Sequence, residues 1–214
     1  MAGLALAFIL GALASLAATW LVEYGARPAL HIAPPSQWGV RRQYPQPDGG
    51  FVQAAFYHVL VSNHRRRCAP LGPRPAWSCH AELQVESDDG ALRIPPIDGR
   101  WTAHPEPVAP AAVADGRSIL LLDPGKILAG RTIDVHRHQS LELCVALKLD
   151  GEDEFYLFNN DSYRFPHWKN PAWRLPRGSY GLRVTVSYEI GVAVREFRLV
   201  NHGPGRDDLQ LVPL

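Results

Sequence analysis

Cysteine is scarce in this chain, which has three among its 214 residues. An odd number excludes a framework in which every cysteine is bridged, although Cys68 and Cys79 could pair across the proline-rich stretch between them. Disulfides mark oxidising compartments, and because nothing else here points to one, we expect all three cysteines to be reduced. Cys79 and Cys144 lie in strand-like runs, where burial raises a thiol pKa and makes the group inert.

An excess of one charge is also missing, since 22 Lys and Arg residues stand against 21 Asp and Glu residues. A net charge of +1 provides no broad electrostatic field for nucleic acid, so no nucleic-acid partner is expected. The familiar enzyme motifs are absent too: there is no GxSxG, HExxH, Walker loop or GxGxxG after a strand. We therefore predict a non-catalytic protein without a cofactor.

Charged residues are missing from the first turns of the chain, between Gly3 and Val22. Twenty residues of helix reach about 30 Å, the thickness of a bilayer core. This pattern predicts a transmembrane helix over residues 1–24 that contacts lipid through residues 3–22. A cleaved signal peptide is the alternative, but a basic n-region is absent and the apolar run is longer than a typical h-region.

The arginines that follow this segment indicate an orientation. No Lys or Arg precedes the helix, whereas Arg27, Arg41 and Arg42 follow it, and positive charge resists translocation. The C-terminal domain is therefore expected in the cytoplasm, with an extracytoplasmic domain as the alternative. Trp20 and Tyr24 are expected at the membrane interface.

Small residues recur at every fourth position of the apolar segment, at Gly3, Ala7, Gly11 and Ser15. Such a stripe lets a second helix approach closely, which indicates self-association or a membrane partner. The alternative is that an Ala- and Gly-rich apolar helix produces the stripe by chance.

The rest of the chain has the composition of an all-β domain. Residues 25–50 hold several prolines and one short strand-like piece, Ala29 to Ile32, and we interpret them as a tether. Nineteen prolines and eighteen glycines separate runs of β-branched and aromatic residues. Residues 51–214 are therefore predicted to form an immunoglobulin-like β-sandwich of about eight or nine strands. The expected strands are 51–63, 77–86, 119–122, 132–135, 141–149, 154–158, 180–188, 192–201 and 209–212.

Alternation of apolar and polar residues gives these strands roles. The 77–86 strand is expected to have one face in the core and one face in solvent. The 141–149 strand is apolar on one face, at Leu141, Leu143, Val145, Leu147 and Leu149, and nearly apolar on the other, so it is expected to be central. The 180–188 and 192–201 strands form a predicted hairpin. Val192 and Val194 alternate on one face of the strand and Phe197 and Leu199 on the other, which predicts a bulge or a change of partner strand near Arg195. Residues 105–114 are expected to form an exposed loop.

Several short segments together resemble a group of prokaryotic single-pass membrane-anchored β-sandwich proteins that has no known activity. They are residues 26–32 (Ala-Arg-Pro-Ala-Leu-His-Ile) directly after the apolar helix, the strands that hold Asn63 and Cys79, residues 158–163 (Phe-Asn-Asn-Asp-Ser-Tyr) and residues 197–201 (Phe-Arg-Leu-Val-Asn). The likeness covers nearly the whole chain. It implies an anchor plus a β domain and supplies no catalytic residues.

Two groups of side chains are candidates for a site. Asp134, His136 and His138 occupy alternate positions, so on a strand their side chains would emerge on one face, as metal ligands sometimes do. A zinc site needs a further ligand, and the sequence does not choose among His58, His64, His80 and His104. The alternative is a solvated strand end. The second group is a surface loop in which aromatic residues stand beside arginines, as binding surfaces use: Tyr163, Arg164, Trp168, Trp173 and Arg174. Those rings could instead cap the end of the sandwich.

The function that follows from these features is a membrane-anchored binding or scaffold module that engages an unidentified protein partner. Two alternatives differ in class. One is a structural subunit of a cell-surface assembly, as in pilins, and the other is a membrane-tethered metallohydrolase built on Asp134, His136 and His138.

Overall fold

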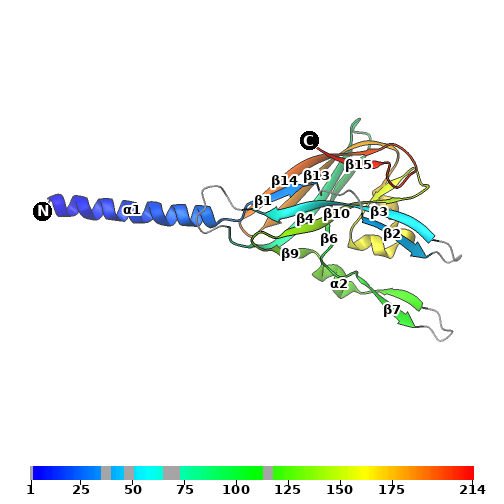
Figure 1. Ribbon diagram of the computed structural model, residues 1–214, viewed down its shortest axis with the longest axis horizontal. Helices are drawn as coiled ribbons and strands as arrows, with labels where there is room; N and C mark the ends of the chain where they lie inside the picture. Colours follow the sequence, from blue (N-terminus) through cyan, green and yellow to red (C-terminus); the bar gives the residue numbers. More distant parts are fainter. Residues whose placement is uncertain (1, 35–39, 46–50, 65–72, 113–117) are drawn as a thin grey trace.

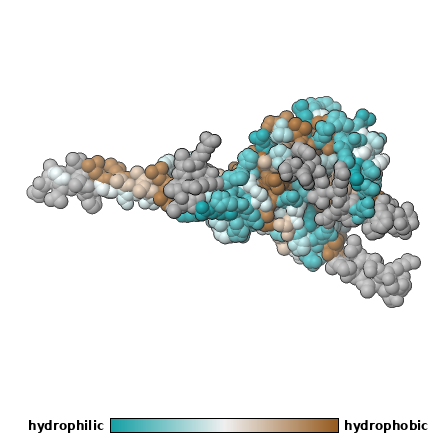
Figure 2. All heavy atoms as spheres, in the orientation of Figure 1, coloured by the Kyte–Doolittle hydropathy of each residue, from teal (hydrophilic) through white to brown (hydrophobic). Residues whose placement is uncertain are grey.

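The computed structural model describes residues 2–34, 40–45, 51–64, 73–112 and 118–214. Its first element is helix α1 (Ala2–Ala26), which extends away from a β domain (Figure 1). The helix is long and apolar enough to span a membrane, and only 11% of its 18-residue segment Ile9–Ala26 is buried in the structure. Hydrophobic residues are visible along its exposed surface (Figure 2). This is weakly consistent with a single-pass anchor.

The β domain consists of two antiparallel sheets and a small β arm. The first sheet has the order β1 (Leu30–Ala33), β3 (Phe51–Asn63), β10 (Ser140–Leu149), β11 (Phe155–Leu157), β12 (Arg174–Leu175), with β2 (Val40–Pro45) on β3 and β6 (Arg100–Trp101) on β10. The second has the order β15 (Leu209–Pro213), β14 (Gly191–Asn201), β13 (Gly178–Tyr188), β4 (Ala76–Ser87), β5 (Arg93–Asp98), with β9 (Thr132–Val135) on β4. The β-rich architecture expected from the sequence is confirmed.

Short helical elements lie between the strands. They are α2 (Pro124–Ala129) and three 3₁₀ turns, η1 (Asn160–Arg164), η2 (Pro166–Trp168) and η3 (Pro171–Trp173). Asn159 caps η1 in a reciprocal arrangement: its side chain accepts from Asp161 N, and Ser162 Oγ accepts from Asn159 N. The 158–173 segment is thus an ordered cover rather than an irregular loop.

One apolar core joins the two sheets. Alternate residues of β4 and β13, such as Leu83 and Val184, meet Val59 and Leu143 of the first sheet, and all four are fully buried. On the opposite face of β4, Glu82, Gln84 and Glu86 reach solvent. The predicted core and wet faces of this strand are confirmed, as are the central position of β10 and the β13–β14 hairpin.

A bulge in β10 overturns the predicted facing of its leucines. The register with β3 shifts between Cys144 and Ala146, so parity changes there. Ala146 joins the main core, whereas Leu147 and Leu149 turn to the outer face and pack in a second cluster with Phe56 and Phe158. The bulge cannot be predicted from the sequence of this strand, because nearly every residue is apolar and both of its faces are therefore expected to be buried.

The same bulge buries Lys148 on the inner side of the sheet. Its ammonium group donates to the backbone carbonyls of Glu152 and Glu154, in the turn that leads to β11. Burial lowers the pKa of Lys148, although acidic side chains around that turn, first Asp153, act in the opposite direction.

The irregularity predicted near Arg195 is wrong. β14 pairs with β13 in unbroken register from Gly191 to Asn201. Val192 and Val194 therefore stay on the outer face, where they are exposed, while Phe197 and Leu199 belong to the core. The sequence pattern suggested an irregularity because apolar residues are normally expected to face the core, whereas Val192 and Val194 at the start of this strand face solvent.

The described residues form fifteen strands, more than the eight or nine predicted, because several are short. β2 falls within the expected tether, and β5 includes two adjacent prolines that weaken its strand signal. Within residues 105–114, expected to form a loop, β7 (Val108–Ala112) pairs with β8 (Ser118–Leu122) to make the arm. Residues 35–39 and 46–50 of the tether lie outside the described residues.

Asn63, at the end of β3, joins the helix to the domain. Its buried side chain accepts a hydrogen bond from Ala29 N (3.2 Å) and donates to Arg74 O (2.8 Å) and Val135 O (3.2 Å). It therefore ties together the segment after α1, the segment before β4 and the end of β9.

We predict that Asn63→Ala destabilises the domain by about 2–4 kcal/mol, because three buried backbone groups lose their partner at once. Urea unfolding of the detergent-solubilised chain measures this difference. Gln210→Ala, on exposed β15, is the control and should be near neutral. An Asn63→Ala chain as stable as the control would contradict the role given to this side chain.

Candidate functional site

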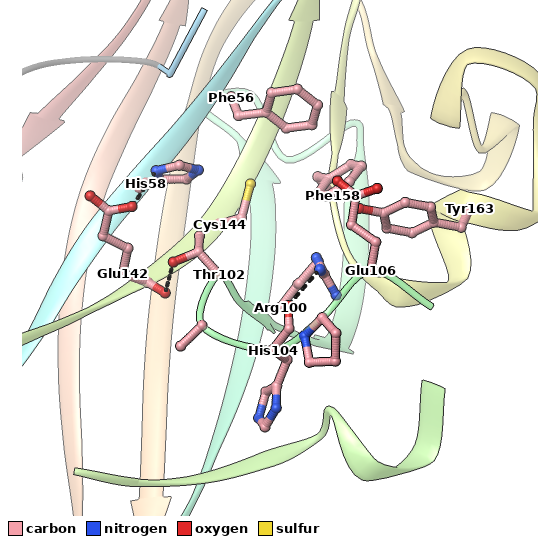
Figure 3. A pocket seen from close by; sticks show the side chains of 12 residues that line it. Phe56, His58, Arg100, Thr102, His104, Glu106, Glu142, Cys144, Phe158 and Tyr163 are labelled. Carbon is pink, nitrogen blue, oxygen red and sulfur yellow. Dashed lines mark hydrogen bonds and ion pairs between the residues drawn. The ribbon is translucent and has the colours of Figure 1, made fainter. Parts of the chain in front are cut away.

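A pocket of about 470 Å³ lies on the outer face of the first sheet, between strands β3, β10 and β6 and the segments that cover them. This volume is in the range of sites for small organic ligands. Its apolar wall is aromatic, with Phe56 and Phe158 in edge contact (4.9 Å between ring centroids) and Tyr163 beside Phe158 (5.6 Å). Figure 3 shows Phe158 and Tyr163 on one side with Glu106 beside them, His58 and Glu142 on the opposite side, and Arg100 and His104 below.

Three polar residues lie in one row across the sheet at this pocket. His58 of β3 is directly opposite Cys144 of β10, and Cys144 is directly opposite Arg100 of β6. Residues paired in this way place their Cβ atoms about 5 Å apart on the same face. All three line the pocket, and each is more than 90% buried.

Arg100 is the most unusual member of the row. Its guanidinium donates to Asn160 Oδ1 and to the backbone carbonyl of His104 (3.1 Å), and it lies over the Tyr163 ring at 5.2 Å. These acceptors are neutral. Among the described residues, no carboxylate forms an ion pair with Arg100, so its buried charge is stabilised only by dipoles and a ring.

His58 faces a carboxylate instead. Its Nδ1 atom lies 3.2 Å from Oε2 of Glu142, which stands two residues before Cys144 on β10. This contact orients the imidazole. Cys144 is buried and packs with Phe56, Leu147 and Phe158 in the second apolar cluster, which is the apolar setting expected for this cysteine, while His58 and Arg100 are its cross-strand neighbours.

The rim of the pocket is the 102–106 segment, which is held by hydrogen bonds. The amide and hydroxyl of Thr102 both donate to Glu142 O (3.0 and 3.2 Å), and the His104 ring contacts Thr132 O (3.0 Å). Glu106 and Ala103 also line the rim and are exposed. The pocket thus combines one buried cation, an aromatic wall and acidic groups near its mouth, a set suited to binding an organic molecule.

The five residues of the predicted surface loop lie in different environments and do not form one site. Tyr163 lines the pocket, and Trp168 packs behind it on Phe56 (5.9 Å). Trp173 packs instead against the main core. Arg164 and Arg174 are exposed and pair with Asp161 (3.1 Å) and Glu154 (3.3 Å).

The predicted metal ligands do not share one strand face. β9 ends at Val135, and His138 adopts a turn conformation with φ 61°. Asp134 accepts from Ser78 N (2.8 Å), His136 packs against Trp77, and His138 contacts Arg137. Across the part of the chain that the structure describes, no three His, Cys, Asp or Glu side chains are grouped to bind a metal ion.

Of the residues that line the pocket, the sequence singled out Tyr163 as a site residue and His58 and His104 only as possible further metal ligands. His58 and His104 are two histidines among nine, and Arg100 stands on a strand of two residues. The one available signal is Glu142 and Cys144, polar residues that alternate within an otherwise apolar strand.

Comparison with known proteins gives no relative from which a role could be transferred: no family model matches the chain, and neither a curated protein nor a solved structure is significantly similar to it. The resemblance to membrane-anchored β-sandwich proteins therefore stays a prediction.

Cys79, by contrast with Cys144, lies in the main core and is fully buried. Burial raises its pKa from 9.0 to about 11, with a smaller contribution from Asp134 in the same direction. Its possible partner Cys68 lies outside the described residues.

This pKa predicts a pH dependence. Because the folded pKa is the higher one, the unfolded thiol ionises first, and the stabilisation present below about pH 9 is lost as the pH rises toward about 11. Between about pH 8 and about pH 10, the free energy of unfolding should fall by about 1 kcal/mol more in the native chain than in Cys79→Ala. Urea unfolding at both pH values tests this, and equal slopes would refute it.

Proposed function

We propose that the chain is a single-pass membrane protein whose β-sandwich domain is a non-catalytic binding module, with the pocket at Arg100 as its ligand site. The module would hold an organic ligand next to the membrane and engage a protein partner there. An immunoglobulin-like arrangement is part of the proposal, supported by two antiparallel sheets that share one core.

The single observation that carries this proposal is the buried guanidinium of Arg100. A buried charge without an opposite charge costs several kcal/mol unless its surroundings compensate. The hydrogen bonds to Asn160 and His104 compensate in part. A ligand carboxylate or phosphate would complete the pairing, since guanidinium binds such groups in a planar, charge-assisted geometry.

The other residues that line the pocket indicate which class of organic ligand it would bind. Phe56, Phe158 and Tyr163 suit an apolar or aromatic body. Glu142 and Glu106 can accept hydrogen bonds, so the ligand should also carry hydroxyl or amino donors on the side that faces the rim. We infer a small organic acid with an apolar body and at least one donor group.

Cys144 provides a native reporter for this preference. Iodoacetate is an anion and iodoacetamide is its neutral analogue; each forms a bond from Sγ to its methylene carbon and releases iodide. We predict that the ratio of the two alkylation rates at Cys144 exceeds the ratio for free glutathione about tenfold, as one charge-assisted hydrogen bond allows. Peptide mass spectrometry reads Cys144 separately from Cys68 and Cys79.

Matched variants identify the cause of that ratio. Arg100→Gln should lower it to the glutathione value, whereas Arg183→Gln, an exposed arginine on the other sheet, should leave it unchanged. Should Arg100→Gln unfold, Ala103→Trp at the exposed rim should slow both reagents by filling the mouth. A native ratio equal to that of glutathione, or a Cys144 inert to both reagents, would reject an anion site in this pocket.

We propose that the domain faces the cytoplasm and that α1 can pair through Gly3, Ala7, Gly11 and Ser15. The orientation is supported by the arginines that follow the helix, of which Arg27 is nearest. The stripe is supported by the space around Gly3 and Gly11, where an added Cβ would meet nothing within 4 Å.

Asp207→Cys, at an exposed turn far from the helix, tests the orientation in a chain whose three native cysteines are replaced by serine. We expect a membrane-impermeant maleimide to label this residue only after cell lysis. Labelling in intact cells would place the domain outside and support the alternative of a cell-surface assembly.

A further inference from the structure

We propose that the end of the β domain next to α1 lies in the interfacial layer of the bilayer, with the β13–β14 turn and Trp77 as its lipid contacts. The inference rests on the membrane anchoring proposed above. It adds a second membrane contact that is independent of the helix itself.

The connection between helix and domain is too short to allow separation from the bilayer. Only three residues, 27–29, lie between the end of α1 at Ala26 and the start of β1 at Leu30. Fully extended, they span about 10 Å. Glu23 in the last helical turn already pairs with Arg74 of the domain (2.9 Å), so the domain begins where the apolar segment ends.

Hydrogen bonds further restrict the orientation of this junction. Arg74 N donates to Ala26 O (2.7 Å), His64 N to Ala29 O (3.1 Å), and the Tyr188 hydroxyl to Pro28 O (3.4 Å). The end of α1 is therefore bonded to the segment before β4, and the residues that follow it are bonded to the ends of β3 and β13. In Figure 1 the long strands run roughly along the direction of α1, which turns their near ends toward the membrane.

The side chains at this end have the character of an interfacial contact. Ile190, in the β13–β14 turn, is 57% exposed, Val192 is 60% exposed, and Trp77 is 44% exposed. Glu189 N donates to Trp77 O (3.3 Å), which holds the turn beside the indole. On the helix, Trp20 and Tyr24 stack with ring centroids 5.2 Å apart and mark the same layer.

The available space decides between lipid and a protein partner. An α-helix with its side chains is about 10 Å across, as wide as the longest gap that residues 27–29 permit. A folded partner would have no room between this end and the bilayer. Lipid headgroups and upper acyl chains are the occupant that fits.

The experiment uses the full chain in phosphatidylcholine vesicles, with one cysteine at Ile190→Cys or at Asp207→Cys and the native cysteines replaced. Each is labelled with an environment-sensitive nitrobenzoxadiazole dye. Flotation with the vesicles first reports whether the chain is anchored. We expect a blue-shifted dye at position 190 with most of its quenching by aqueous iodide lost, and a fully quenched dye at 207.

The outcomes separate the two proposals. A chain that floats but whose dye at position 190 is quenched like that at 207 overturns the contact and leaves the anchor intact. A chain that does not float overturns both. If the cysteine replacements prevent folding, the native chain and Trp77→Phe are compared in vesicles with bromine-labelled lipid. Trp77→Phe should lose part of the fluorescence that the brominated lipid quenches, whereas Trp173→Phe should not. Equal losses in the two variants would overturn the proposal.

Discussion

The bulge in β10 is the constraint on which the outer half of this domain depends. Up to Cys144 the outer face of the first sheet carries polar groups, and beyond the bulge it carries Leu147 and Leu149. An apolar outer face must be covered, and the 158–173 segment covers it with Phe158, Tyr163 and Trp168. The pocket is the space left where this cover ends and the polar part of the strand begins.

That placement explains how a row of polar residues comes to lie beneath an aromatic wall. Arg100, Cys144 and His58 face outward on neighbouring strands, so each would be solvated if the face were open. The cover removes much of the solvent, and Tyr163 and Asn160 of the same cover then provide contacts for the guanidinium. The 158–173 segment therefore does two things when it folds over the sheet. It covers the apolar residues beyond the bulge, and it provides the Arg100 guanidinium with a neutral hydrogen-bond acceptor and an aromatic ring.

Local patterns predicted strands but not how strands meet. β3 and β9 were predicted to the residue, because alternation and flanking turn residues act within a few positions. At Arg195 parity misled for a local reason, because Val192 and Val194 face outward although the register with β13 is unbroken. The bulge at Cys144 depends on pairing with β3, far along the chain, so parity alone missed it. The pocket was missed for a related reason: His58, Arg100 and Glu142 share no motif and come together only through cross-strand pairing.

The junction at Asn63 links the pocket to helix α1, the proposed anchor. β3 runs from this residue to His58, five positions away, which at about 3.3 Å per residue places the row roughly 17 Å along the strand from the junction. In the membrane-anchored arrangement proposed above, a ligand would enter the pocket from water while the near end of the domain touches lipid. A rigid junction would therefore hold the pocket at a set height above the bilayer, where a flexible tether would not.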